Sequence, residues 1–314
     1  MARFRFASLW LSQVARILAD NCLRVFIFLT LVHGTTATTE RESAWHLLAA
    51  LLALPPIVLA PLNGAISNSL RKRYVLAGTA LYCGAVTAVF GLAGGPWVAC
   101  WALVAVGAAI YSPTRYALLP AAAEDSGLPL TRINGLIEMG AVTAIIVGWI
   151  VGGHLHGWRL LDLDAAVVLA AGLNLFALVT ALPVRFHADV RRPESPGQAI
   201  AGFFRDTRRI LAEPEARGSL LALASLRGLV GAMMGAILAV ALGGGRFTID
   251  NLIVDIALWI ALGVAVGSLL AGVQRHPRRA LGLVPIGCSG LLLGLILSAA
   301  GGVPGPVLCV ILGA

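Results

Sequence analysis

Ionisable side chains interrupt an apolar stretch near the start of the chain. The segment SQVARILADNCLRVFIFL carries Arg16, Asp20 and Arg24 among residues suited to a bilayer. At 100° per residue, these three and Gln13 fall within an arc of about 80° on a helix, with Asp20 one turn from each arginine. Asn21 widens this polar face. Such a stripe can bind phosphate through guanidinium groups and balance charge with a carboxylate.

The cost of these charges indicates which way the helix faces. A charge at the centre of a membrane span costs roughly 2.5–3.5 kcal/mol, so three cost on the order of 8–10 kcal/mol. The thirteen Leu, Ile, Val and Phe residues of the span, residues 7–32, contribute about 0.3–0.6 kcal/mol each, or about 4–8 kcal/mol in total. We therefore expect the stripe to face a polar interior. It either lines a translocation pathway or forms a structural salt bridge that locks the helices together.

The composition places the whole chain in a membrane. Hydrophobic residues make up 59% and charged residues only 12% of the 314 residues, whereas soluble domains carry about 25% charged residues. The basic residues lie between apolar runs, which argues against a nucleic-acid partner. The five cysteines lie inside apolar runs without metal or redox spacing. They are expected to be small buried side chains, and no metal or cofactor is predicted.

Apolar runs that can cross a bilayer in about 20 residues recur along the chain. Spans are expected near 7–32, 45–66, 74–93, 96–112, 134–153, 164–183, 219–241, 251–273 and 281–300. A tenth begins near residue 303, so we expect the sequence to be cut inside a helix. The prediction is an all-α membrane protein of about ten transmembrane helices. It comprises a six-helix bundle (1–183), a cytoplasmic basic linker (184–217) and a partial second bundle (218–314).

The distribution of basic residues predicts the orientation. If the N-terminus is cytoplasmic, 17 of the 23 lysines and arginines lie in inner segments and three lie in outer loops. Because inner loops carry the excess of positive charge, the N-terminus is predicted to be inside.

The linker contains the segment QAIAGFFRDTRRILAE, residues 198–213, which mixes large apolar and basic residues. We expect an amphipathic helix there. It either lies on the anionic inner leaflet or is a solvated linker helix.

Six helices, a long basic link and further helices are the plan of two-bundle transporters, whose halves are parallel repeats. Arg227 lies in the seventh span, the counterpart of the first, and would add a second cationic helix suited to phosphate. Glu138 lies in the inner half of the fifth span. It could hold an ammonium group or carry a proton, or it could be an interfacial carboxylate bonded to a neighbouring helix end.

Several ordered segments resemble the lysophospholipid transporters of the major facilitator superfamily. Gln13 and the pair Asp20-Asn21 match that family's Q…DN pattern, and PLNGAISNSLRK is similar to the motif between its second and third helices. SPTRYALLP followed by RINGLIE is the most specific match, similar to P-x-K-Y-x-x-L-P and A-N-G-L-x-E. GSLLAG and LGLVPIG continue the agreement in the second half, so the resemblance extends from the first span to the ninth.

The resemblance implies the major facilitator fold and inward movement of lysophospholipid, chiefly lysophosphatidylethanolamine, across the bacterial inner membrane. It implies a carrier without chemistry of its own that works with an acyltransferase, separate or fused. Two other functions stay open: a general small-molecule or drug efflux carrier of the same superfamily, and the membrane part of a bifunctional acyltransferase. The sequence contains no H-x4-D pair and no adenylate-binding loop to support the last one.

The candidate residues form two groups. The substrate-binding candidates are Gln13, Arg16, Asp20, Asn21, Arg24, Glu138 and Arg227. The gating candidates are Gly64, Asn68, Ser69, Lys72, Arg115, Tyr116 and Asn134. Gly64 is expected in a tight loop, and Asn68 stands where the family's loop motif normally has Asp. Arg115 replaces a Lys of the family pattern, and Ala121 follows where the family tends to have Glu, so the gating chemistry departs from that of the family.

Overall fold

A computed structural model describes residues 2–33, 38–160, 163–186 and 195–225, with isolated helical positions at 228, 267, 287 and 289. The helices are α1 (Ala2–His33), α2 (Thr38–Ser69), α3 (Lys72–Ala93), α4 (Trp97–Tyr116), α5 (Leu119–Ser126), α6 (Leu130–Leu155), α7 (Ala165–Ala181) and α8 (Pro196–Ala212). Between α6 and α7, β1 (Arg159–Leu160) and β2 (Leu163–Asp164) form a short antiparallel hairpin. Most of the predicted second bundle, including Arg227, lies outside the described residues.

Six long helices overlap the six spans expected in the first half of the chain. Three of the described helical segments are long and apolar enough to cross a membrane: Lys72–Ala93, Trp97–Ser126 and Leu130–Leu155. Shorter apolar stretches occupy Ala53–Ile66 in α2 and Ala165–Ala181, the whole of α7. The three charged side chains Arg16, Asp20 and Arg24 exclude α1 from the three. The expected total of about ten helices stays a prediction.

Two features of the connections differ from the expectation. α2 continues to Ser69, and only Leu70 and Arg71 separate it from α3. Gly64 therefore lies inside a helix, where an added Cβ would meet no atom within 4 Å, and not in a tight loop. The short helix α5 was not expected either. Pro120 lies in the first turn of α5, a position where a missing backbone N–H costs nothing. The helix α5 ends at Gly127, which adopts the left-handed conformation.

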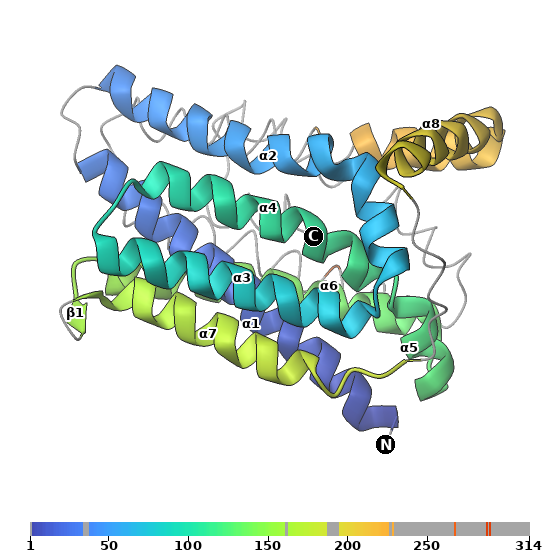
Figure 1. Ribbon diagram of the computed structural model, residues 1–314, viewed down its shortest axis with the longest axis horizontal. Coiled ribbons are helices and arrows are strands. Elements are labelled where there is room, and N and C mark those ends of the chain that lie inside the picture. The colour runs from blue at the N-terminus through green and yellow to red at the C-terminus, as the bar shows by residue number, and fades with distance from the viewer. Residues whose placement is uncertain are drawn as a thin grey trace.

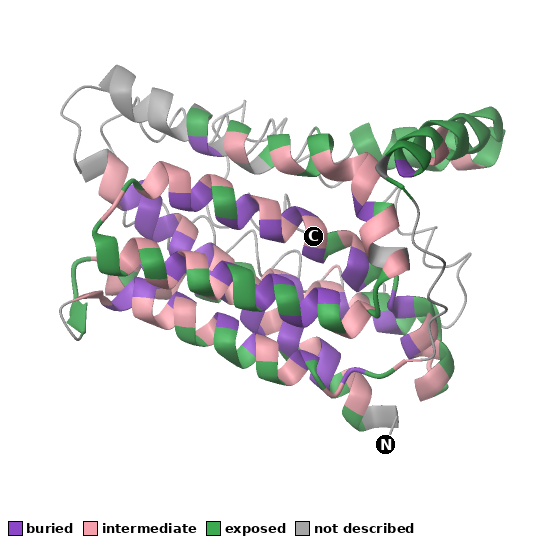
Figure 2. Ribbon diagram, in the orientation of Figure 1, coloured by how far each residue is buried: buried purple, intermediate pink, exposed green. Residues whose placement is uncertain are grey.

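α1 is the central helix of the described bundle. It packs most extensively against α6 and α7, while α3 packs against both α4 and α7 (Figure 1). Glycines allow the close approach of α6: a Cβ on Gly152 would lie 2.6 Å from the carbonyl oxygen of Cys22, and one on Gly148 would lie 3.0 Å from that of Leu18. Figure 2 shows buried positions running along α1, with exposed positions on the outward sides of α3 and α7.

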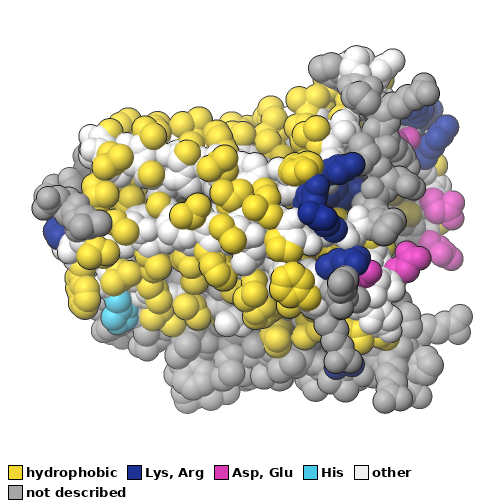
Figure 3. Space-filling model, turned by 60° about the horizontal axis from the view of Figure 1, so that its bottom comes forward, with side chains coloured by type: hydrophobic (Ala, Val, Ile, Leu, Met, Phe, Trp, Pro, Cys, Tyr) yellow, Lys and Arg dark blue, Asp and Glu magenta, His cyan; other side chains and the backbone are white. Residues whose placement is uncertain are grey.

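The surface is apolar along the sides of the helices and charged at one end of the bundle. Large hydrophobic side chains are exposed on α2, α3 and α7, such as Ile57, Leu92 and Leu175. Figure 3 shows this apolar surface, with the acidic side chains and most of the basic side chains in view gathered at one end. That end carries the N-terminus, the α2–α3 connection and α5 (Figure 1). The distribution is the one from which a cytoplasmic N-terminus is predicted.

Candidate functional site

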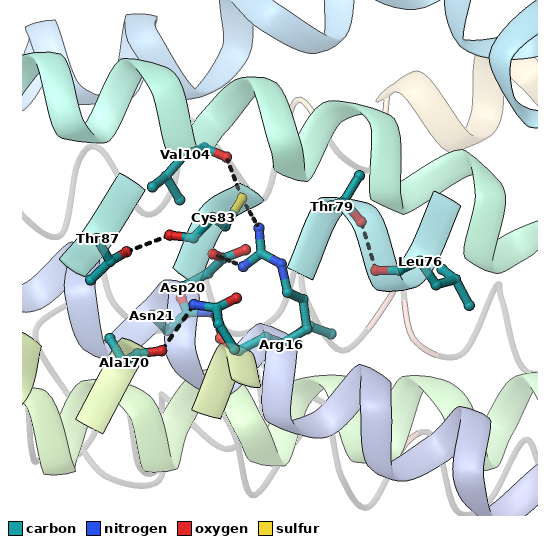
Figure 4. Close-up of polar contacts among 11 residues, drawn as sticks. Arg16, Asp20, Asn21, Leu76, Thr79, Cys83, Thr87, Val104 and Ala170 are labelled. Atoms are coloured by element: carbon teal, nitrogen blue, oxygen red, sulfur yellow. Dashed lines mark hydrogen bonds and ion pairs between the residues drawn. The ribbon is translucent and has the colours of Figure 1, made fainter. Parts of the chain in front are cut away.

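Arg16 is sealed inside the bundle. Its residue is 0% exposed, and its Nη1 donates to Oδ1 of Asp20 one turn away in an ion pair. Its Nη2 donates to Sγ of Cys83 on α3 at 2.8 Å, and its guanidinium carbon lies 5.9 Å from the ring centroid of Tyr111 on α4. Figure 4 shows the guanidinium reaching from α1 towards α3 and α4. The stripe is thus turned away from lipid, as expected from the free-energy cost of placing charged side chains in hydrocarbon.

Asp20 differs from its partner in being partly accessible. Its side chain is 15% exposed, whereas that of Arg16 is 1% exposed. The carboxylate is therefore partly accessible while its Oδ1 is held by Arg16. Within the ion pair, Arg16 fixes the carboxylate and neutralises it.

Arg24 is held by an aromatic ring instead of a carboxylate. Its guanidinium carbon lies 5.0 Å from the ring centroid of Trp101 on α4, a cation–π arrangement. The indole is fixed in turn, because its Nε1 donates to the carbonyl oxygen of Leu48 on α2 at 3.0 Å. Among the described residues, Arg24 makes no ion pair, and its buried Nε has no hydrogen-bond partner. Of the two arginines within reach of Asp20, the structure pairs Asp20 with Arg16, and Arg24 has no ion pair in the described part of the chain.

The two amides of the stripe join α1 to α6. Gln13 is fully buried, and its Nε2 donates to the carbonyl oxygen of Ile137 at 2.6 Å. Its buried Oε1 has no hydrogen-bond partner among the residues that the structure describes. Asn21 accepts a hydrogen bond from Nε1 of Trp149 at 3.0 Å. These contacts fix the rotation of α1, and they place the charged side chains towards α3 and α4.

Glu138 belongs to a different cluster, at the charged end of the bundle. Its Oε1 accepts a hydrogen bond from Oη of Tyr116 at 2.6 Å and lies 4.0 Å from Nη2 of Arg115. The Arg115 guanidinium also lies over the Tyr116 ring, 4.3 Å from its centroid. No described contact joins Glu138 to the stripe of α1. Of the two interpretations of Glu138, these contacts correspond to the interfacial carboxylate bonded to a neighbouring helix end. The other interpretation is a group that holds an ammonium or carries a proton.

Within the part of the chain that the structure describes, no hydrogen bond or ion pair joins Ser69, Lys72 or Asn134 to that cluster. Ser69 and Lys72 flank the α2–α3 connection, and Asn134 is exposed on α6. Asn68 lies on the last turn of α2, and its side chain is outside the described part.

Several buried polar groups were missed by the sequence analysis. Cys83 is buried, as Cys22 and Cys100 are, but its contact with Arg16 left no sequence signal. Asn63 is 7% exposed and donates from Nδ2 to the carbonyl oxygen of Ala109 at 3.0 Å, which ties α2 to α4. A lone Asn within an apolar run was the available signal for that contact.

Long apolar helices that enclose a buried ion pair and an aromatic-bound arginine define a helical-bundle membrane protein. The chain belongs to the major facilitator superfamily, because the sequence model described as Major Facilitator Superfamily matches residues 9–314. The superfamily assignment drawn from the motifs is thereby confirmed.

Curated relatives agree with the narrower resemblance. The chain is 34% identical over 167 residues to the lysophospholipid transporter LplT of Pectobacterium carotovorum subsp. carotovorum (strain PC1), over 52% of this chain and 40% of that protein. It is 34% identical over 168 residues to LplT of Yersinia pestis (strain Pestoides F), over 52% and 39%. For LplT of Shigella flexneri serotype 5b (strain 8401), the identity is 32% over 171 residues, 52% and 42%. The chain thus spans less than half the length of these relatives, and the alignments cover about half of the chain.

Proposed function

We propose that this protein is a secondary transporter that moves lysophospholipid, chiefly lysophosphatidylethanolamine, across the bacterial inner membrane by alternating access. The membership of the major facilitator superfamily and the names of the relatives support this proposal. In this proposal the N-terminus is cytoplasmic, and an acyltransferase, separate or on the same polypeptide, consumes the imported lysolipid.

The observation that carries the proposal is that the two arginines of α1 have different partners. Arg16 is closed off by its ion pair, whereas Arg24 has only the Trp101 ring and an unsatisfied Nε among the described residues. A zwitterionic headgroup presents both phosphate and ammonium. In the proposal Arg24 binds the phosphate, and the accessible edge of Asp20 balances charge or meets the amine. Arg227 of the second half supplies a further guanidinium.

The cluster of Arg115, Tyr116 and Glu138 supports a gate at the charged end. These contacts tie the last turn of α4 to α6 across a surface where Glu138 is still 36% exposed. A partly exposed contact of this kind can break and re-form as helices move, since its strength is modest. In the proposal the gate combines this cluster with Gly64, Asn68, Ser69, Lys72 and Asn134, and Glu138 acts there and not on the headgroup.

The test is a translocation assay in proteoliposomes. Labelled lysophosphatidylethanolamine is offered on one side, and the fraction protected from albumin back-extraction is measured with and without a pH or sodium gradient. The expected result is protein-dependent protection that protein-free vesicles lack. A drug efflux carrier would instead show proton-coupled movement of drugs and no movement of lysolipid, which would overturn the proposal.

A further inference from the structure

α8 is a helix defined by its own sequence signals. Ser195 and Gln198 form a capping box: Oγ of Ser195 accepts from the backbone N–H of Gln198 at 3.3 Å, and Oε1 of Gln198 accepts from that of Ser195 at 3.0 Å. Pro196 occupies the first turn, where it is favourable. The helix is therefore specified locally, and its faces can be assigned residue by residue.

One face of α8 is apolar and largely uncovered. Its bulky members fall within an arc of about 120° on a helix: Ile200, Phe203, Phe204, Ile210 and Leu211. All five are exposed, with Phe204 at 62%, although α8 packs against α2. Of the α8 residues whose burial is described, only Ala199 is buried, at 5%. An exposed apolar face of this extent marks an interaction site.

The opposite side of α8 is cationic. Arg205, Arg208 and Arg209 lie on it, and the side chains of Arg205 and Arg209 are 66% and 76% exposed. Asp206 approaches both to 3.9 Å, but exposed pairs of this kind are weak. α8 lies at the end of the bundle that carries the N-terminus and α5, where the other basic side chains also gather (Figures 1 and 3). The helix thus combines an open apolar face with positive charge at the charged end of a membrane protein.

We propose that α8 lies on the anionic lipid surface of the leaflet at this end of the bundle. Its apolar face enters the boundary between headgroups and acyl chains, and its arginines bind lipid phosphates. The charge complementarity favours anionic lipid as the occupant. A solvated linker would leave two phenylalanines and three aliphatic side chains in water.

The experiment measures amide hydrogen exchange of residues 196–212 in the full chain, reconstituted as single copies in nanodiscs. The discs contain phosphatidylcholine alone or mixed with phosphatidylglycerol. A basic residue near an anionic leaflet contributes about 1 kcal/mol, roughly a fivefold factor, so three arginines predict up to about 100-fold slower exchange in the anionic discs. The triple variant R205Q/R208Q/R209Q should lose this difference, and the matched variant R205K/R208K/R209K should keep it.

The other outcomes are equally distinct. Phe204→Ser should weaken the protection while peptides from α3 and α6 exchange as in the wild type, which shows that the bundle is folded. Equal exchange of α8 in both kinds of disc, or protection that survives the triple glutamine variant, would overturn the proposal. Protection that appears only in discs holding two copies would assign the face to a second copy of the chain and would also overturn it.

Discussion

A double-mutant cycle on Arg16 and Asp20 separates a structural ion pair from a functional one. Asp20→Asn leaves the guanidinium of Arg16 buried without its counter-charge, and breaking a buried pair in this way costs about 3–5 kcal/mol. Since Asp20 is 15% exposed, we expect the lower end, about 3 kcal/mol. Arg16→Met should cost less, because Arg24 one turn away still neutralises Asp20. The double variant R16M/D20N removes both charges of the pair, leaves Arg24 in its place on the Trp101 ring, and should recover most of the lost stability.

The assay pairs unfolding in mixed detergent micelles with lysolipid uptake in proteoliposomes. If Asp20 takes part in transport, the double variant recovers stability but not uptake, and Asp20→Asn inserts normally yet takes up no lysolipid. Recovery of both stability and uptake would show that the ion pair only stabilises the packing of the helices and takes no part in transport. A loss below about 1 kcal/mol in Asp20→Asn is what an exposed pair would show, and it would refute the sealed geometry of Arg16.

Two further predictions concern packing and gating. Gly152→Ala places a Cβ against the backbone of Cys22, 2.6 Å from its carbonyl oxygen, and overpacking of this kind should lower the free energy of unfolding by about 1–3 kcal/mol. Gly78→Ala, where no atom lies within 4 Å, is the matched control and should stay within about 1 kcal/mol of wild type in the same detergent titration. Tyr116→Phe removes the 2.6 Å hydrogen bond to Glu138, worth about 0.5–1.5 kcal/mol, and should change the uptake rate a few-fold at unchanged lysolipid affinity. Unchanged uptake kinetics, or a change confined to affinity, would remove this bond from the gate.

The inward direction of α1 followed from the sequence, because the positions and cost of its charges allow one orientation. The choice of ion-pair partner for Asp20 did not follow from the sequence. Asp20 lies one turn from Arg16 and from Arg24, and the choice depends on Cys83 and Trp101, which come from helices far along the chain. Local spacing holds no information on those neighbours.

The same limit applies at the charged end of the bundle. The motifs SPTRYALLP and RINGLIE were found in the sequence, but the contact of Tyr116 with Glu138 is a tertiary one between α4 and α6. The end of α2 was placed too early because a glycine and polar residues suggested a loop. A single helical Gly costs only about 1 kcal/mol, and the helix continues through it.

The most direct test of the account is whether Arg24 recognises phosphate. Binding of lysophosphatidylethanolamine and of a monoacylglycerol with the same acyl chain is measured on the purified protein. A hydrogen-bonded contact with a charged group is worth about 1.5–3 kcal/mol, so the wild type should prefer the phospholipid by about 10- to 100-fold. Arg24→Gln should lose that preference while keeping its affinity for monoacylglycerol. An equal preference in both proteins would contradict the assignment of the phosphate to Arg24.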